Sequence, residues 1–143
     1  MENLRHVKVV TVSQAGLDRQ GDRSRLIERT LERVVKAIAV EKPRILCLPE
    51  CFAGREPEPV PGPSTERLAA LAREHACYMI CPLTATVDGT LRNTAVVIDD
   101  GGVMIGRYDK TYLTEKELAR GLVPGRLDPP VFETDFGIVG IRI

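Results

Sequence analysis

A short apolar run that follows a predicted helix constrains the fold of this chain more than any other stretch. Residues 45–48 read Ile-Leu-Cys-Leu and come after Pro43, which ends the preceding helix. An unbroken apolar run of this length is typical of a strand buried on both faces. Pro49 stops the strand, so Glu50 lies at its carboxyl end, where open α/β sheets bind ligands. Glu50 is a candidate site residue, although most carboxylates at such a place are only solvated.

The chain before this run predicts one strand and one helix. Residues 6–12 are β-branched and nearly alternating, which favours a strand. Asp22 is a plausible N-cap for a helix that runs to Pro43. Its apolar residues recur at helical spacing, which predicts packing on a sheet; they are Leu26, Ile27, Leu31, Val34, Val35 and Ile38. Strand, helix and strand together predict a parallel crossover.

After Glu50 the same pattern continues across a proline-rich loop. Residues 54–63 contain four prolines, which exclude a helix or a central strand, and we interpret them as a loop over the site. Residues 64–75 predict a second helix, and residues 77–82 a third strand.

The pattern then changes to antiparallel hairpins. Strands are expected at residues 84–87, 94–98 and 103–108, separated by Asp88-Gly89 and by residues 99–102, which are turn sequences. Residues 110–125 predict an irregular, partly helical segment. A last hairpin is expected from residues 131–133 and 136–143, so that the chain ends within a strand. The expected fold class is α/β (α+β).

Charge and hydropathy exclude several function classes. Lys plus Arg and Asp plus Glu both number 20, so the chain lacks the basic surface of a nucleic-acid-binding protein. Residues 1–6 lack the apolar run of a secretion signal, and no stretch is long enough to span a bilayer, which predicts a cytoplasmic protein without membrane contact.

The four cysteines form two C-x-x-x-C pairs, Cys47 with Cys51 and Cys77 with Cys81. A zinc or redox site is one interpretation. Three of them lie in apolar, strand-like runs, where free cysteine is commonly buried, and structural zinc favours tighter spacing on loops. We therefore predict no metal and no disulfide.

Four motifs in order resemble the carbon-nitrogen hydrolase (nitrilase and amidase) family over essentially the whole chain. They are Leu-Pro-Glu at Glu50, Arg-Asn-Thr-Ala at Asn93, Gly-Arg-Tyr-Asp-Lys at Lys110, and Val-Pro-Gly ending at Gly125 before the last hairpin. Several spaced motifs in the right order are more specific than any one of them.

This resemblance implies an α-β-β-α sandwich, incomplete at the C-terminus, with residues 1–143 as the N-terminal portion of one domain. It implies a homodimer or larger homo-oligomer that uses no cofactor. Glu50 would be the general base, Lys110 the catalytic lysine, and Glu117 the supporting carboxylate, with Glu115 as the alternative. The nucleophilic cysteine would follow Ile143. The substrate would be a small amide or N-carbamoyl compound, cleaved through a thioester.

Other interpretations remain open from the residues alone. The fold could serve a nitrilase or a non-catalytic assembly module. Lys110 and Glu117 could be solvated surface groups, and Asn93 could be a turn residue. Cys51 could be taken for the nucleophile, but neighbouring residues on a strand point to opposite sides. Tyr112 stands where the family often has His.

Overall fold

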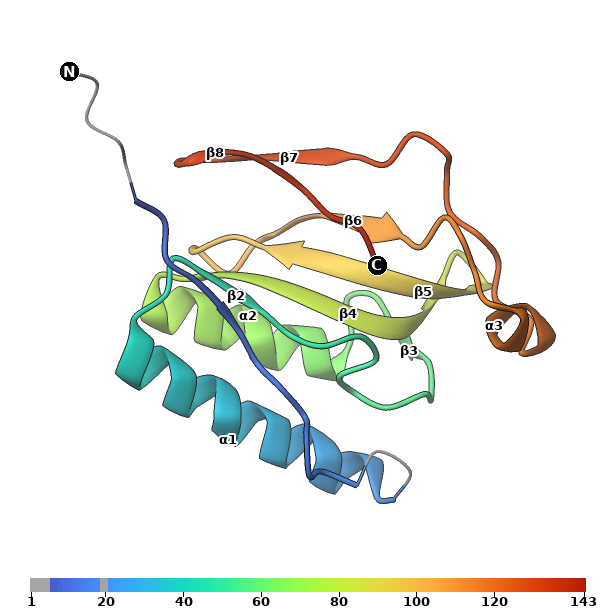
Figure 1. Ribbon diagram of the computed structural model, residues 1–143, viewed down its shortest axis with the longest axis horizontal. Helices are drawn as coiled ribbons and strands as arrows, with labels where there is room; N and C mark the ends of the chain where they lie inside the picture. Colours follow the sequence, from blue (N-terminus) through green and yellow to red (C-terminus); the bar gives the residue numbers. More distant parts are fainter. Residues whose placement is uncertain (1–5, 19–20) are drawn as a thin grey trace.

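The computed structural model describes residues 6–18 and 21–143, arranged in layers (Figure 1). Two helices cover one face of a six-stranded sheet, and a two-stranded hairpin lies on the other side. The prediction that the chain has no secretion signal depends largely on residues 1–5, which lie outside the residues that the structure describes. The elements in chain order are β1 Val9–Thr11, α1 Arg23–Glu41, β2 Ile45–Cys47, β3 Glu58–Pro59, α2 Pro63–His75, β4 Tyr78–Val87, β5 Thr90–Ile98, β6 Met104–Asp109, α3 Glu115–Ala119, β7 Val131–Thr134 and β8 Gly137–Gly140.

The main sheet combines parallel and antiparallel strands in the order β1-β2-β4-β5-β6, and its sixth strand, the short β3, pairs in parallel with β4. β1 pairs with β2 and β2 with β4 in parallel, whereas β4, β5 and β6 are joined antiparallel. The predicted parallel crossover and the later hairpins are therefore confirmed. Asp88 and Gly89 both have positive φ, at 50° and 72°, which is the geometry of a type I′ hairpin turn.

Helix α1 forms where its cap and its apolar spacing predict it. The Asp22 side chain accepts a hydrogen bond from the Arg25 backbone N–H at 3.1 Å, as expected of an N-cap. The last helical residue is Glu41. Lys42, which caps the C-terminus with a left-handed φ of 47°, directly precedes Pro43. Its buried face, which includes Leu31 and Val34, packs on the sheet.

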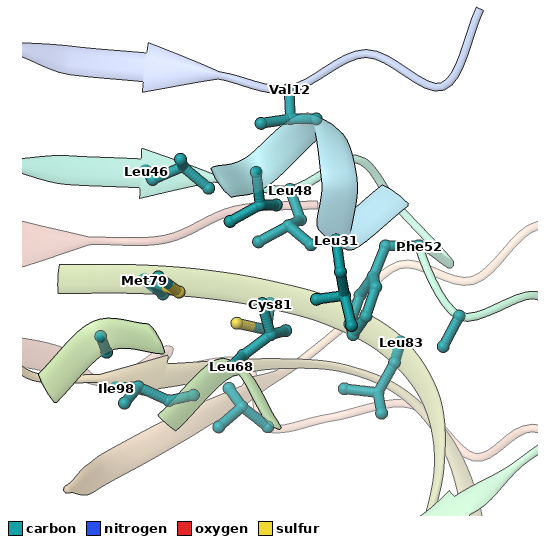
Figure 2. Close-up of a cluster of buried hydrophobic side chains, with 14 of the residues drawn as sticks. Val12, Leu31, Leu46, Leu48, Phe52, Leu68, Met79, Cys81, Leu83 and Ile98 are labelled. Atoms are coloured by element: carbon teal, nitrogen blue, oxygen red, sulfur yellow. The ribbon is translucent and has the colours of Figure 1, made fainter. Parts of the chain in front are cut away.

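The main core lies between the two helices and the sheet (Figure 2). Alternate residues of β4, Met79, Cys81 and Leu83, point into it and are fully buried. They meet Leu31 of α1 and Leu68 of α2 (Figure 2). Since strand side chains alternate, the intervening residues of β4 and β5 face the opposite side of the sheet, toward the hairpin.

One prediction about the strands is wrong: residues 77–82 and 84–87 were expected to form separate strands, but β4 continues through Pro82 as one strand to Val87. Within a strand the N and the carbonyl O of one residue point to the same side. The Pro82 carbonyl accepts from the Phe52 N–H at 3.2 Å, so its missing N–H donor also faces that side, beyond the end of β2 at Cys47. The ladder to β5 on the other side is therefore uninterrupted, with Pro82 opposite Ala95.

The predicted last strand is also shorter than expected. The β7–β8 ladder ends where Gly140 meets Val131, and residues 141–143 are not in a strand. The hairpin is attached to the main sheet by Phe132, which is buried against Gly106; a Cβ on Gly106 would lie 2.7 Å from the Phe132 ring. Arg44 pairs with Asp135 in the hairpin turn.

No helix in the described part of the chain is long and apolar enough to cross a membrane.

A buried ion pair fixes the proline-rich loop that follows Glu50. Glu58 is 4% exposed and accepts hydrogen bonds from Arg23 of α1 and from the Ser64 N–H and hydroxyl at the start of α2. Arg23 also donates to the Ala53 carbonyl at 2.9 Å. The loop is thus connected to both helices.

We expect Arg23→Met to lower the free energy of unfolding by about 2–3 kcal/mol, because it leaves a buried carboxylate with only neutral partners. Chemical denaturation of the intact protein measures this change. The matched control is Arg67→Met, which removes a bidentate pair with Glu28 whose side chains are about half exposed and should change stability by about 0–1 kcal/mol. Equal losses in the two variants would contradict the prediction.

Candidate active site

Glu50 lies in a tight turn directly after the strand β2. The turn is held from several sides: the Gln14 side chain donates to the Phe52 carbonyl at 2.6 Å, and the Phe52 N–H bonds to β4. Cys51 has a left-handed φ of 54°, which allows the chain to reverse here. The Glu50 side chain is 46% exposed and so reaches the surface of the site.

Lys110 is the first residue after β6. Its backbone N–H donates to the Asn93 carbonyl of β5 at 2.8 Å, which extends the β5–β6 ladder by one bond. On its other side the Gly125 N–H donates to the Lys110 carbonyl at 2.9 Å. A Cβ on Gly125 would lie 2.1 Å from the Asp109 carbonyl oxygen, so this close approach requires glycine. The Val-Pro-Gly motif thus fixes the backbone of Lys110.

Glu117 lies in the short helix α3 and takes part in its capping box. The Thr114 hydroxyl accepts from the Glu117 N–H at 3.3 Å, while Glu117 Oε2 accepts from the Thr114 N–H at 2.8 Å. The Thr114 hydroxyl donates to the same oxygen at 3.0 Å. One carboxylate oxygen of Glu117 is therefore occupied by its own helix, and Oε1 faces the site.

The structure brings Glu50, Asn93, Lys110 and Glu117 together at one point. Lys110 Nζ lies 2.8 Å from Glu50 Oε1 and 3.2 Å from Glu117 Oε1. Asn93 Nδ2 donates to the same two oxygens, at 2.6 Å and 2.7 Å. Two donors and two acceptor oxygens form a closed ring of charge-assisted hydrogen bonds.

The electrostatics of this ring keep Lys110 and Glu117 ionised. Burial acts to raise the pKa of Glu117, but the hydrogen bonds from Thr114, Asn93 and Lys110 outweigh it and hold the pKa at about 2. For Lys110 burial acts to lower the pKa, but the bonds to Glu50 and Glu117 prevail and raise it. The ammonium and the Glu117 carboxylate thus stabilise each other's charged forms.

The structure distinguishes between the two predicted supporting carboxylates by position. Glu117 contacts Lys110 and is 13% exposed, whereas Glu115 is exposed on the first turn of α3. The Thr-x-x-Glu spacing from Thr114 to Glu117 is a capping-box signature, which predicts from the sequence that the Glu117 side chain folds back onto the start of α3. Asn93, considered above as a turn residue, lies inside β5 and is 1% exposed.

Cys51 does not lie on a strand, so strand alternation was the wrong reason to set it aside as nucleophile. It belongs to the turn, with its Sγ 3.8 Å from the Thr84 hydroxyl. Tyr112 is 68% exposed, and the guanidinium of Arg142 lies 5.9 Å from the centre of its ring.

The other cysteines are free thiols: Cys47 and Cys81 lie in β2 and β4, and Cys77 directly precedes β4. Burial raises the pKa of Cys47, Cys77 and Cys81, that of Cys77 to about 11, which disfavours the thiolate needed for attack or for metal ligation. Within residues 6–18 and 21–143, no three His, Cys, Asp or Glu side chains are grouped to hold a metal ion.

Comparison with known proteins identifies the family. The model of the carbon-nitrogen hydrolase family matches residues 9–143. The chain belongs to the carbon-nitrogen hydrolase family. It is 32% identical over 140 residues to a beta-ureidopropionase of Arabidopsis thaliana, and 31% identical over 132 residues to an omega-amidase of Xenopus tropicalis.

Solved structures agree with this fold. The crystal structure of an N-terminal amidase matches 83% of the chain with a TM-score of 0.72 and 25% identity. A carbon-nitrogen hydrolase from Helicobacter pylori matches 85% of it with a TM-score of 0.70 and 21% identity.

The chain is shorter than these relatives. The matches cover 85% of this chain but 34% of the ureidopropionase, and 78% of this chain but 46% of the omega-amidase. For the N-terminal amidase and the Helicobacter pylori structure, the chain covers 31% and 47% of their lengths. The chain therefore spans between about a third and a half of the proteins it matches.

The low pKa of Glu117 predicts a pH dependence of stability. Because its pKa in the folded state is about 2, against an ordinary value of 4.5, ionised Glu117 stabilises the fold above its unfolded-state pKa, and this contribution is lost as the pH falls from about 4.5 toward 2. Denaturation of the intact protein should therefore show Glu117→Gln less stable than wild type at neutral pH, with the difference shrinking below about pH 4.5. A stability difference between the two proteins that stays constant down to the lowest pH at which both are folded would contradict this prediction.

Proposed function

We propose that this protein hydrolyses the carbon-nitrogen bond of a small amide or N-carbamoyl compound through a cysteine thioester. Residues 1–143 are the N-terminal portion of one carbon-nitrogen hydrolase domain, and the nucleophilic cysteine lies beyond Ile143. The observation that carries the proposal is the position of the Lys110 ammonium, within 3.2 Å of both the Glu50 and the Glu117 carboxylates.

The different surroundings of the two carboxylates support different roles. Glu117 is 13% exposed, is bonded on both oxygens, and has its pKa held at about 2, so it remains an anion that fixes Lys110. Glu50 is 46% exposed and can therefore meet a substrate and a thiol. A general base must lie within hydrogen-bond reach of the proton that it removes. Glu50 is accordingly the base, and Glu117 the supporting group.

The first half-reaction forms the thioester. Glu50 accepts the thiol proton, and the sulfur attacks the carbonyl carbon of the amide. The oxygen of the tetrahedral intermediate becomes an anion, which the Lys110 ammonium stabilises together with backbone N–H groups. The carbon-nitrogen bond then breaks as Glu50 returns its proton to the departing nitrogen, and ammonia or an amine leaves.

The second half-reaction restores the enzyme. Glu50 accepts a proton from a water molecule, and the resulting hydroxide attacks the thioester carbonyl. The carbon-sulfur bond breaks, the thiolate takes the proton back, and the carboxylic acid product is released. Every proton and electron pair in the two half-reactions comes from the thiol, the substrate or water, and no oxidation state changes, so the proposed reaction uses no cofactor.

The substrate class is chosen by similarity to the two curated relatives, an omega-amidase and a ureidopropionase. The homodimer or larger oligomer implied by the family resemblance is part of the same proposal.

Glu50→Gln should reduce ammonia release by on the order of 10³-fold, because the amide cannot accept the thiol proton. The intact protein is assayed on a panel of small amides, N-carbamoyl compounds and nitriles. Glu115→Gln is the matched control on an exposed neighbouring glutamate and should retain wild-type rates. Activity that survives in Glu50→Gln, or that is lost in Glu115→Gln, would refute the assignment of the base.

Cys51→Ala should retain activity, because the proposed nucleophile lies elsewhere and Cys51 contacts Thr84. Rapid acid quenching during turnover, followed by peptide mass spectrometry, should detect the acyl group on a cysteine beyond Ile143. An acyl adduct on Cys51 itself would overturn the proposal for the nucleophile.

A further inference from the structure

Asn93 contacts two carboxylates of the candidate site, and its position in a β-strand does not by itself require these contacts. It lies on β5 with its side chain on the face of the sheet opposite the helices, opposite Thr84 of β4. The residue is 1% exposed, and its backbone carbonyl accepts the N–H of Lys110 at 2.8 Å. It therefore contacts the candidate site through both its main chain and its side chain.

The orientation of the Asn93 amide follows from its partners. Nδ2 lies 2.6 Å from Glu50 Oε1 and 2.7 Å from Glu117 Oε1. Ionised carboxylates only accept hydrogen bonds, so the nitrogen and not the oxygen must face them. Both amide hydrogens are used, one for each carboxylate. Oδ1 is buried and has no hydrogen-bond partner within the described part of the chain, so the protein retains this orientation despite an unsatisfied acceptor.

The charges around this amide explain why a neutral donor suits the position. Two carboxylates and one ammonium leave a net charge of −1 in the ring. A second cation in place of Asn93 would neutralise that charge and weaken the base, and an acceptor there would repel both carboxylates. An amide supplies two donors without adding charge. The neighbouring charged residues Arg92 and Asp109 face each other at 3.7 Å.

We propose, on the basis of the amidase function proposed above, that Asn93 is a positioning residue that bridges the base Glu50 to the supporting carboxylate Glu117 and sets their separation around Lys110. It acts through these groups rather than on the substrate. Its removal therefore affects the chemical step more than substrate binding.

Asn93→Leu and Asn93→Asp in the intact protein test this role. Loss of both donors in Asn93→Leu should lower kcat by on the order of 10²-fold with little change in KM, because the base is no longer held in place. In Asn93→Asp an ionised Asp repels the two carboxylates, whereas a protonated Asp can donate one hydrogen bond. The ratio of Asn93→Asp to Asn93→Leu activity should therefore rise as the pH is lowered. A ratio independent of pH would show that the charge and the hydrogen bond at position 93 do not act on Glu50 and Glu117.

A second measurement does not depend on activity. The Glu117 carboxyl group, followed through its ¹³C resonance by NMR in protein labelled with ¹³C-glutamate, should become protonated at higher pH in Asn93→Leu than in wild type, because one of the hydrogen bonds that lower its pKa is gone. Thr94→Val, at the next residue of β5, is the matched control. It removes the partly buried hydrogen bond from the Thr94 hydroxyl to Asp109 and should leave the Glu117 titration unchanged.

An unchanged Glu117 titration in Asn93→Leu, or a pH-independent activity ratio, would overturn the positioning role. Failure of the amidase proposal gives a different result. If wild-type protein releases no ammonia from any compound of the panel, that function is refuted, while the Glu117 titration still supports or overturns the role of Asn93.

Discussion

The site depends on one ammonium held between two carboxylates. Removing charges from water is unfavourable unless each charge is paired and hydrogen-bonded. Here the Lys110 side chain is 11% exposed and Glu117 13%, so burial disfavours the charged form of each, and the hydrogen bonds between them offset that cost. The hydrogen bonds from Thr114 and Asn93 complete the set by supplying donors to both carboxylates. Pairing of these charges and burial of the site therefore depend on each other.

The rest of the structure holds the segments that carry these groups. β2 ends before the Glu50 turn, β5 carries Asn93, and Lys110 directly follows β6. The turn after Glu50 is bonded to Gln14 and Arg23, and Arg23 is fixed by the buried Glu58. Gly125 lies against the backbone beside Lys110, in an approach that only glycine permits. The Val-Pro-Gly motif and the proline-rich loop therefore act on the site through the backbone.

Short sequence patterns predicted the helix caps and turns, which depend on interactions between residues close together in the chain. Asp22 caps α1 as its position predicts, and the Asp88-Gly89 turn joins two antiparallel strands. The prediction that the third strand ends with Pro82 was wrong, because the cost of a proline depends on which neighbour its missing N–H faces. Here it faces the side on which β2 has already ended, and only the assembled sheet determines that. The last strand ends at Gly140 because its partner β7 begins opposite, at Val131.

For the site, the sequence by itself determined the family resemblance and the candidates Glu50, Lys110 and Glu117. It could not determine that Glu50 and Lys110, sixty residues apart, lie 2.8 Å from each other, because strand order and register set that distance. It also left Asn93 open as a turn residue. Only the tertiary structure placed that amide inside β5 with both donors on carboxylates, because its role depends on two partners from other segments that sequence spacing does not bring together.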